Sequence, residues 1–296
     1  MPETTFWRES DQKLGEIIHH ILPPVSRILV KGLDACLMGL VEIAYQARGL
    51  ARQLIVSENQ AWSVFGYERY MAAVGSATTP GALSGRIADL YRGKVNVDRL
   101  PYTISVLDMS QLEEVARRTD ALAGELLRYA LAGPDNRAVL TQLRAQAQKF
   151  DSSNNGQITD DDEYVSMGHF AQLVQGGVSD SAVVSAAAQL RTSLSKLVTT
   201  NYLGSGLLNG TQMSLNDARG LAIYYPPRPG FRTYGPYRNE LSFARDTRWD
   251  EFLQAQLAAL ALNVEPVPPP NPAAPLPYEN QPSSATFTVW LPAVRR

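Results

Sequence analysis

The sequence has almost no cysteine and no excess of basic residues. It contains one cysteine and three histidines in 296 residues, and a single cysteine cannot form a disulfide within the chain, which excludes a disulfide-stapled scaffold. The 27 basic and 29 acidic residues leave a net charge of −2. Because no basic excess is present to attract phosphates, we expect no nucleic-acid partner.

Long hydrophobic runs are also missing. No segment approaches the roughly 18 uninterrupted apolar residues of a membrane-spanning helix, so we expect no membrane span. The first residues, Met1 to Thr5, carry neither the basic stretch nor the apolar stretch of a secretory signal peptide. The cellular compartment therefore stays open.

What the chain does contain is typical of a globular α/β protein, with 45% hydrophobic and 19% charged residues. Its composition changes sharply near residue 264, where prolines become frequent and favour a stiff extended linker. The pattern predicts four parts, which are a polar N-terminal segment (1–13), a folded domain (14–263), a Pro-rich linker (264–283) and the start of a further strand or domain (284–296).

Hydrophobic periodicity predicts the elements of the folded domain. Short β-branched runs predict strands at 25–33, 54–57, 102–107 and 221–225. Helical spacing predicts helices at 14–22, 37–54, 110–132, 136–149, 163–175, 180–200 and 247–262. Strands that alternate with helices favour a largely parallel sheet, whose ligands bind at the carboxyl ends of the strands. Four strands are few for this much helix, so we expect the first strands of the sheet to lie outside the chain.

Cys36 follows the first of these strands and precedes the predicted helix at 37–54. A thiolate at a helix start is stabilised by unpaired backbone N–H groups and by the helix dipole, and the thiolate is the nucleophilic form of cysteine. Glu58 ends the next strand, where a solvated or hydrogen-bonded carboxylate is a simpler interpretation than a catalytic one.

Several motifs around Cys36 resemble the clostripain family of cysteine peptidases. The most specific runs from Gly32 to Gly39, and it is followed by shorter matches in the same order. These are Val41-Glu42-Ile43-Ala44-Tyr45, Val56-Ser57-Glu58, Ile104-Ser105-Val106-Leu107-Asp108-Met109, Tyr164-Val165-Ser166-Met167-Gly168-His169-Phe170 and Gly220-Leu221-Ala222-Ile223-Tyr224-Tyr225-Pro226. The resemblance covers about residues 14–262, so the folded domain is interpreted as a partial clostripain-like peptidase domain.

This resemblance implies a caspase-like fold, a three-layer sandwich with a central, largely parallel β-sheet between helices and a His–Cys dyad at the strand ends. It also implies cleavage after arginine or lysine. By this resemblance Cys36 is the nucleophile, and its backbone N–H is one donor to the oxyanion. Asp34 matches an acidic substrate-binding position, where a carboxylate would pair with the basic side chain of the substrate. As an alternative, Asp34 is the N-cap of a helix that begins near Ala35.

The histidines depart from the family pattern. In the family the catalytic histidine lies in a His-Gly motif on an earlier strand, and in the related caspases it lies about 50 residues before the cysteine. Only 35 residues precede Cys36, and no glycine follows His19, His20 or His169. Ser166 also stands where the family more often has aspartate. We therefore expect the catalytic histidine to be absent from this chain and to be supplied by an upstream or separate segment.

Family members are commonly activated by cleavage between the histidine strand and the cysteine strand. Arg8 and Lys13 lie in that interval and are candidate cut sites.

The segment from Asp151 to Asp162 resembles a calcium-binding loop. Oxygen-bearing side chains stand at loop positions 1, 3, 5, 9 and 12, with glycine at position 6. This spacing indicates a calcium site built by Asp151, Ser153, Asn155 and Asp162. As an alternative, such Asp/Asn/Ser/Gly stretches form ordinary surface turns.

The sequence thus favours a clostripain-like cysteine endopeptidase that cleaves peptides or proteins after arginine or lysine through a Cys36 acyl-enzyme. One alternative is a non-catalytic pseudopeptidase that keeps the pocket as a binding module. Another is a calcium-responsive adhesion or scaffold domain at the end of a Pro-rich stalk.

Overall fold

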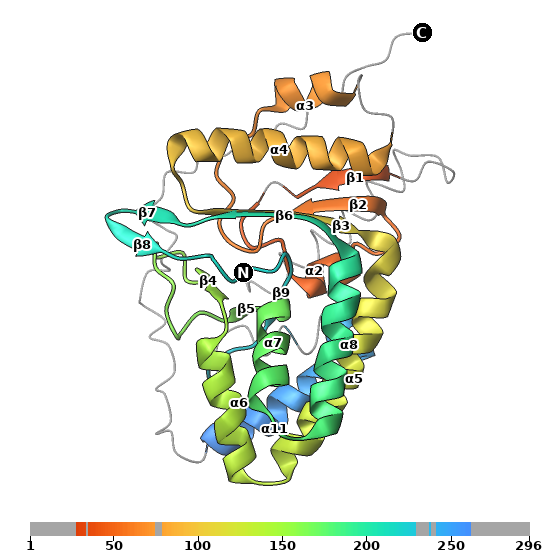
Figure 1. The fold of residues 1–296 in the computed structure, drawn as a ribbon, viewed down its shortest axis with the longest axis vertical. Coiled ribbons are helices and arrows are strands. Elements are labelled where there is room, and N and C mark those ends of the chain that lie inside the picture. Colours follow the sequence, from red (N-terminus) through yellow and green to blue (C-terminus); the bar gives the residue numbers. More distant parts are fainter. Residues whose placement is uncertain (1–27, 34, 75–78, 229–236, 238–240, 262–296) are drawn as a thin grey trace, which may run out of the picture. The chain divides into compact units, whose positions relative to one another are not determined.

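Helices and strands are mixed along the chain in an α/β fold (Figure 1). The computed structural model describes residues 28–33, 35–74, 79–228, 237 and 241–261. Contacts within the chain divide it into Met1–Leu262 and Asn263–Arg296, and every described residue lies in the first unit. The sequence predictions for 1–13, 14–22, 264–283 and 284–296 fall outside the described residues.

The helices and strands have the following bounds. The helices are α2 (Val41–Gln46), α3 (Tyr67–Val74), α4 (Pro80–Asp98), α5 (Leu112–Leu131), α6 (Pro134–Gln146), α7 (Met167–Gly177), α8 (Ser181–Leu197), α10 (Ser242–Asp246) and α11 (Trp249–Ala261), with the 3-10 turn η1 (Met109–Gln111). The strands are β1 (Ile28–Gly32), β2 (Ala51–Val56), β3 (Tyr102–Asp108), β4 (Lys149–Phe150), β5 (Tyr164–Ser166), β6 (Val198–Gly204), β7 (Gly206–Leu208), β8 (Thr211–Met213) and β9 (Ala222–Tyr224). None of the helices that the structure describes is long and apolar enough to cross a membrane.

The main sheet has four strands in the order β1-β2-β3-β6. Strands β1 and β2 are parallel, whereas β2–β3 and β3–β6 are antiparallel. The expected largely parallel sheet is therefore wrong for the described strands. Two helices, α3 and α4, connect β2 to β3, and β3 begins beside the end at which β2 stops. The two strands are therefore antiparallel, and alternation of strands and helices in the sequence does not reveal this direction.

A second sheet of three antiparallel strands, β4-β5-β9, lies next to the turn that follows β1. The two sheets meet at Gly39 and Leu40. The Gly39 N–H donates to the carbonyl of Ser57 just after β2 at 2.7 Å, and the Gly39 carbonyl accepts from the N–H of Ala222 in β9 at 2.7 Å. Leu40 also forms a parallel bridge with Ala222. The segment after Cys36 is thus held between both sheets.

Helices cover both faces of the main sheet, as expected from the sequence. Side chains alternate along the strands, so Ile55, Ile104 and Val106 face α4 in one core cluster. Leu54 and Leu107 belong to a larger core on the other face, which includes side chains of α5, α7, α8 and α11. Strand β3 is central and nearly all its residues are buried, including the polar Thr103 and Ser105.

Helix α4 was not predicted from the sequence. Thr79 caps it by accepting from the N–H of Ala82 at 3.1 Å, and Pro80 occupies its first turn. Its buried face consists of Ser84, Ala88, Tyr91 and Val95. These residues have helical spacing, but two of the four are small and one is polar, so the hydrophobic pattern is weak.

Three predicted helices have different bounds in the structure. The helix expected at 37–54 is only α2, because the chain turns at Gly49 with a φ of 80° and enters β2 at Ala51. The helices expected at 163–175 and 180–200 each include residues that pair as strands, namely β5 before α7 and β6 after α8. These residues are strands because β5 pairs with β9 and β6 pairs with β3. Helical periodicity cannot detect such distant partners.

The close approach at Gly39 gives a test of the fold. A Cβ on residue 39 would lie 2.7 Å from the carbonyl carbon of Ser57, which belongs to the backbone and cannot rotate away. We expect Gly39→Ala to lower the free energy of unfolding by about 1–3 kcal/mol in urea titrations. The matched control is Gly85→Ala in α4, where a Cβ meets nothing within 4 Å. This substitution should stabilise the helix by about 0.5–1 kcal/mol. Equal stability of Gly39→Ala and wild type would contradict the described packing.

Candidate active site

Cys36 lies on an exposed turn between β1 and α2. The helix begins at Val41 with Leu40 as its N-cap, so the prediction that the cysteine occupies a helix start is wrong. Leu37 follows with a φ of 60°, an uncommon left-handed conformation for a leucine, and its N–H donates to the carbonyl of Asn59 at 3.0 Å. The turn is therefore shaped by backbone contacts with the segment after β2 rather than by a helix.

The thiol of Cys36 is hydrogen-bonded to Ala61 of that segment. The Ala61 N–H donates to Cys36 Sγ at 3.4 Å, and the Cys36 thiol donates to the Ala61 carbonyl oxygen at 3.7 Å. The backbone of Ala61 therefore meets the sulfur with both a donor and an acceptor. No residue pattern around Ala61 points to this contact.

Asp34, the predicted substrate-binding acid, lies outside the described residues, and its substrate role stays a prediction. The alternative that Asp34 caps the helix after Cys36 is wrong, because Leu40 holds that position.

His169 is the one histidine that lies within the described residues. It sits on α7, is 9% exposed, and its Nδ1 accepts from the N–H of Gln148 at 3.0 Å. Burial lowers the pKa of its imidazole, so the ring is predominantly neutral near pH 7. This environment fits a structural histidine, whereas His19 and His20 lie outside the described residues.

Glu58 is fully buried at the end of β2, next to the segment that contacts Cys36. Its Oε2 accepts from the N–H of Gly220 at 2.8 Å, which links the end of β2 to the turn before β9. Burial raises the pKa of its carboxyl to about 8, and hydrogen bonds from Gly220 and Ser166 offset only part of this effect. Ser166, the family departure noted from the sequence, is itself buried and accepts from the N–H of Arg219 at 3.0 Å.

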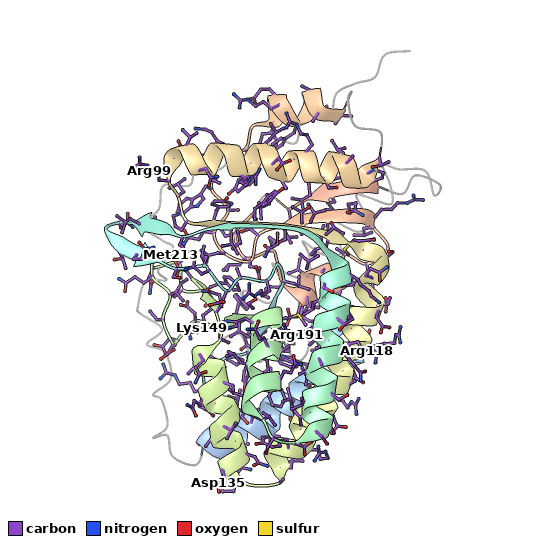
Figure 2. All side chains as sticks on the ribbon, in the orientation of Figure 1. Arg99, Arg118, Asp135, Lys149, Arg191 and Met213 are labelled. Carbon is purple, nitrogen blue, oxygen red and sulfur yellow. The ribbon has the colours of Figure 1, made fainter. Side chains whose placement is uncertain are left out.

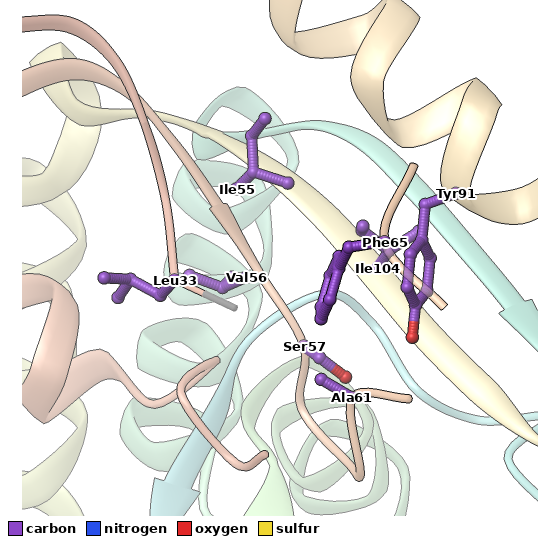
Figure 3. Close-up of a pocket in the computed structure, with 8 residues that line it drawn as sticks. All are labelled: Leu33, Ile55, Val56, Ser57, Ala61, Phe65, Tyr91 and Ile104. Carbon is purple, nitrogen blue, oxygen red and sulfur yellow. The ribbon is translucent and has the colours of Figure 1, made fainter. Parts of the chain in front are cut away.

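A small pocket lies beside the Cys36 turn, between the main sheet and α4 (Figure 3). It is lined by Leu33, Ile55, Val56, Ser57, Ala61, Phe65, Tyr91 and Ile104. Its volume of about 10 Å³ is close to the space that one water needs. It cannot hold a substrate side chain in this conformation.

Comparison with known proteins identifies the family. The sequence model of the Clostripain family matches residues 13–256, which is most of the chain. This chain belongs to the clostripain family. The search of curated proteins found no significant match.

Solved structures with a similar fold are also cysteine proteases. A cysteine protease of B. fragilis shares 20% identity over 81% of this chain and 95% of its own, with a TM-score of 0.55. A clostripain from Bacteroides thetaiotaomicron in complex with the peptide inhibitor BTN-VLTK-AOMK shares 16% identity over 83% and 94%, with a TM-score of 0.56. A secreted cysteine protease from the same species, in complex with an irreversible peptide inhibitor, shares 17% identity over 81% and 63%, with a TM-score of 0.56. At these identities the likeness shows the fold.

In this member of the clostripain family, the Asp151–Asp162 loop has its carboxylates turned inward. Asp151 accepts from the N–H groups of Asn155 at 3.0 Å and Gly156 at 2.8 Å. Asp162 accepts from the N–H groups of Ser152 at 2.9 Å and Thr159 at 2.6 Å. Lys149, labelled in Figure 2, borders the loop 3.1 Å from Asp160.

These contacts fill much of the acceptor capacity that calcium would use. Both carboxylates approach the Ser153 hydroxyl, at 3.3 Å from Asp151 and 3.4 Å from Asp162. In the part of the chain that the structure describes, no group of three or more His, Cys, Asp or Glu side chains converges as a metal site. Calcium binding by Asp151, Ser153, Asn155 and Asp162 would require the loop to give up N–H contacts, and it stays a prediction.

Calcium titration by calorimetry tests that prediction. If calcium binds as the loop spacing predicts, Asn155→Ala should weaken binding at least about tenfold, because one oxygen ligand is lost. Gln157→Ala is the matched control, since Gln157 is exposed on the same loop and is not a predicted ligand. Equal heats in wild type and Asn155→Ala, or no heat in wild type, would end the proposal.

The buried carboxyl of Glu58 predicts how stability depends on pH. The folded chain keeps Glu58 protonated up to about pH 8, whereas in the unfolded chain it ionises near 4.5. Between these values the folded state binds more protons, so stability falls as pH rises, by at most about 1.4 kcal/mol per pH unit for this group.

Urea unfolding of wild type and Glu58→Gln between pH 5 and 9 checks this expectation. The amide cannot ionise, so the variant should lose less stability between pH 7 and 8. Glu42 is also buried, with a pKa of about 7, and accounts for the slope that remains at lower pH. Glu68→Gln, at an exposed site, should follow the wild-type slope, and an unchanged slope in Glu58→Gln would refute the assignment.

Proposed function

We propose that this chain is the nucleophile-bearing part of a cysteine endopeptidase that hydrolyses peptide bonds after arginine or lysine. The observation that carries the proposal is the exposed Cys36 turn, which is held at Gly39 and Leu37 by backbone hydrogen bonds and presents its sulfur beside an N–H donor. Family membership and the cysteine proteases among similar structures support it. A caspase-like His–Cys dyad is part of this proposal.

The chemistry starts from the Cys36 thiolate. Sulfur attacks the carbonyl carbon of the scissile peptide bond, and the resulting oxyanion is stabilised by the backbone N–H of Cys36. When the amine half of the substrate leaves with a proton from the base, the acyl half remains on Cys36 as a thioester. Water then attacks the thioester carbonyl, the C–S bond breaks, and the carboxylate product leaves as the thiol is regenerated.

Substrate choice is assigned to Asp34. Its carboxylate would pair with the guanidinium of arginine or the ammonium of lysine. The inhibitor bound to one similar structure contains the peptide VLTK, whose last residue is lysine, and this supports a basic side chain as the partner of Asp34.

The general base is assigned to a histidine on a further segment, either upstream or separate. Within the described part of the chain, β1 pairs only with β2, so its other edge can accept another strand next to the Cys36 turn. A strand bound there would place its end near the thiol, as a dyad requires.

A non-catalytic binding module is the competing proposal. It is favoured by the environment of His169, which is hydrogen-bonded to Gln148 inside the fold rather than placed at the thiol. A protein without a base at Cys36 could keep the pocket and bind peptides without cleaving them.

Reporter cleavage separates these proposals. Arg- and Lys-terminated peptide amides should be hydrolysed by a protein that includes the upstream segment, and Cys36→Ala should reduce kcat/KM by about 10³-fold or more. Peptide binding without turnover in that protein would support the binding module.

Asp34→Asn tests the source of specificity. Loss of a charge-assisted pair should lower kcat/KM for Arg reporters by about 10- to 100-fold. Asp135→Asn is the control, because Asp135 is an exposed aspartate on α6 (Figure 2). The assignment fails if both variants behave alike.

A further inference from the structure

The segment from Ser57 to Ala61 contacts the Cys36 turn on one side and the Asp151–Asp162 loop on the other. Toward the turn, the carbonyl of Asn59 accepts from Leu37 and Ala61 meets the sulfur of Cys36. These contacts set the position of the backbone around the thiol.

Side chains of the same segment reach the distant loop. Asn59 Oδ1 accepts from the N–H of Asp151 at 3.0 Å. Gln60 Nε2 donates to Asp151 Oδ2 at 2.8 Å and to Asn154 Oδ1 at 3.0 Å. Gln60 immediately precedes Ala61, so the residue bound to the loop is bonded directly to the residue that touches the sulfur.

Burial makes these links firm. Asn59 and Asp151 are fully buried, and Gln60 is 8% exposed. A buried donor that loses its acceptor carries the full cost of desolvation, so Gln60 has a strong preference for its position against Asp151. Asn59 is fixed further because its N–H donates to Thr103 Oγ1 at 3.1 Å in the central strand.

The loop itself is anchored to the core. The guanidinium of Arg144 donates to the carbonyl oxygens of Asp160 at 2.7 Å and Tyr225 at 3.1 Å, and also to that of Asp162. Arg144 is 5% exposed. The loop that accepts the hydrogen bonds of Gln60 is therefore itself held in place by Arg144.

We propose that Gln60 is a positioning residue for Cys36, which holds Ala61 against the thiol by anchoring its own side chain on Asp151 and Asn154. The consequence for catalysis rests on the proposed function, whereas the effect on the thiol does not. Gln60 acts through Ala61 and touches neither the sulfur nor a substrate.

Alkylation of Cys36 by iodoacetamide in the full chain tests the proposal, because the chain has one cysteine and the signal has one source. Gln60→Leu removes the side-chain donor without adding charge. Ala61 would then no longer keep its N–H at the sulfur. Because the reactive thiolate loses a donor, we expect alkylation about fivefold slower, the scale of a typical net hydrogen bond. Gln157→Leu makes the same change at an exposed site of the loop and should stay within about twofold of wild type.

A second variant covers the case in which Gln60→Leu does not fold, as judged by circular dichroism. Asn154→Gly removes one of the two acceptors of Gln60 and keeps the left-handed backbone at residue 154, where φ is 52°. It should slow alkylation by about threefold and add nothing further in a folded Gln60→Leu background. An unchanged or faster rate in the folded variants, or equal slowing in Gln157→Leu, would overturn the proposal.

Reporter hydrolysis by a protein that includes the upstream segment distinguishes this proposal from the proposed function. If that protein is a peptidase, Gln60→Leu should lower kcat with KM unchanged, because Gln60 touches no substrate. Slower alkylation without hydrolysis in any form would sustain the positioning role and count against the peptidase.

Discussion

Two backbone hydrogen bonds at Gly39 join the two sheets and fix the backbone near the candidate active site. The N–H of Gly39 is bound by the segment after β2 and its carbonyl by β9, each at 2.7 Å. Cys36 lies three residues before this point and α2 begins two residues after it. Since a side chain at position 39 would collide with the backbone of Ser57, only glycine allows the two sheets to meet there without displacement. The placement of the thiol follows from that meeting.

Buried carboxyls strengthen the same junction. Glu42 accepts from the N–H of Tyr224 at 2.9 Å and from the hydroxyl of Tyr237 at 3.1 Å, and Glu58 accepts from Gly220. Glu42 from α2 and Glu58 just after β2 are thus both hydrogen-bonded to the backbone in or next to β9. Burial raises the pKa of both groups, so their hydrogen bonds form against the cost of desolvating a carboxyl. Such directional contacts fix one register where apolar packing alone would allow several.

Sequence reasoning succeeded where the residue pattern reflects burial. Strand β3 was predicted within one residue of its bounds because both its faces are covered, and α5 and α11 were predicted because their apolar residues recur at helical spacing. Helix α4 was missed because its face toward the sheet uses small residues such as Ala88. The helix predicted at 180–200 includes only the first three residues of β6 (198–200), and the pairing with β3 makes these residues a strand. Strand direction was also missed, because the α3–α4 connection leaves no periodic signature.

The motif around Cys36 was enough to predict the family, and hydrophobic spacing was enough to predict several core elements, such as β3, α5 and α11. These features are encoded locally, in residue types and their spacing along the chain. Three features became visible only in the folded chain: Cys36 lies on a turn rather than at a helix start, Ala61 contacts its sulfur, and Gln60 links this contact to Asp151. The side-chain contacts join residues at least 25 positions apart, and the turn is held by backbone hydrogen bonds to Ser57 and Asn59. Hydrogen bonds between such distant segments form only when the chain has folded, so no local sequence pattern predicts them.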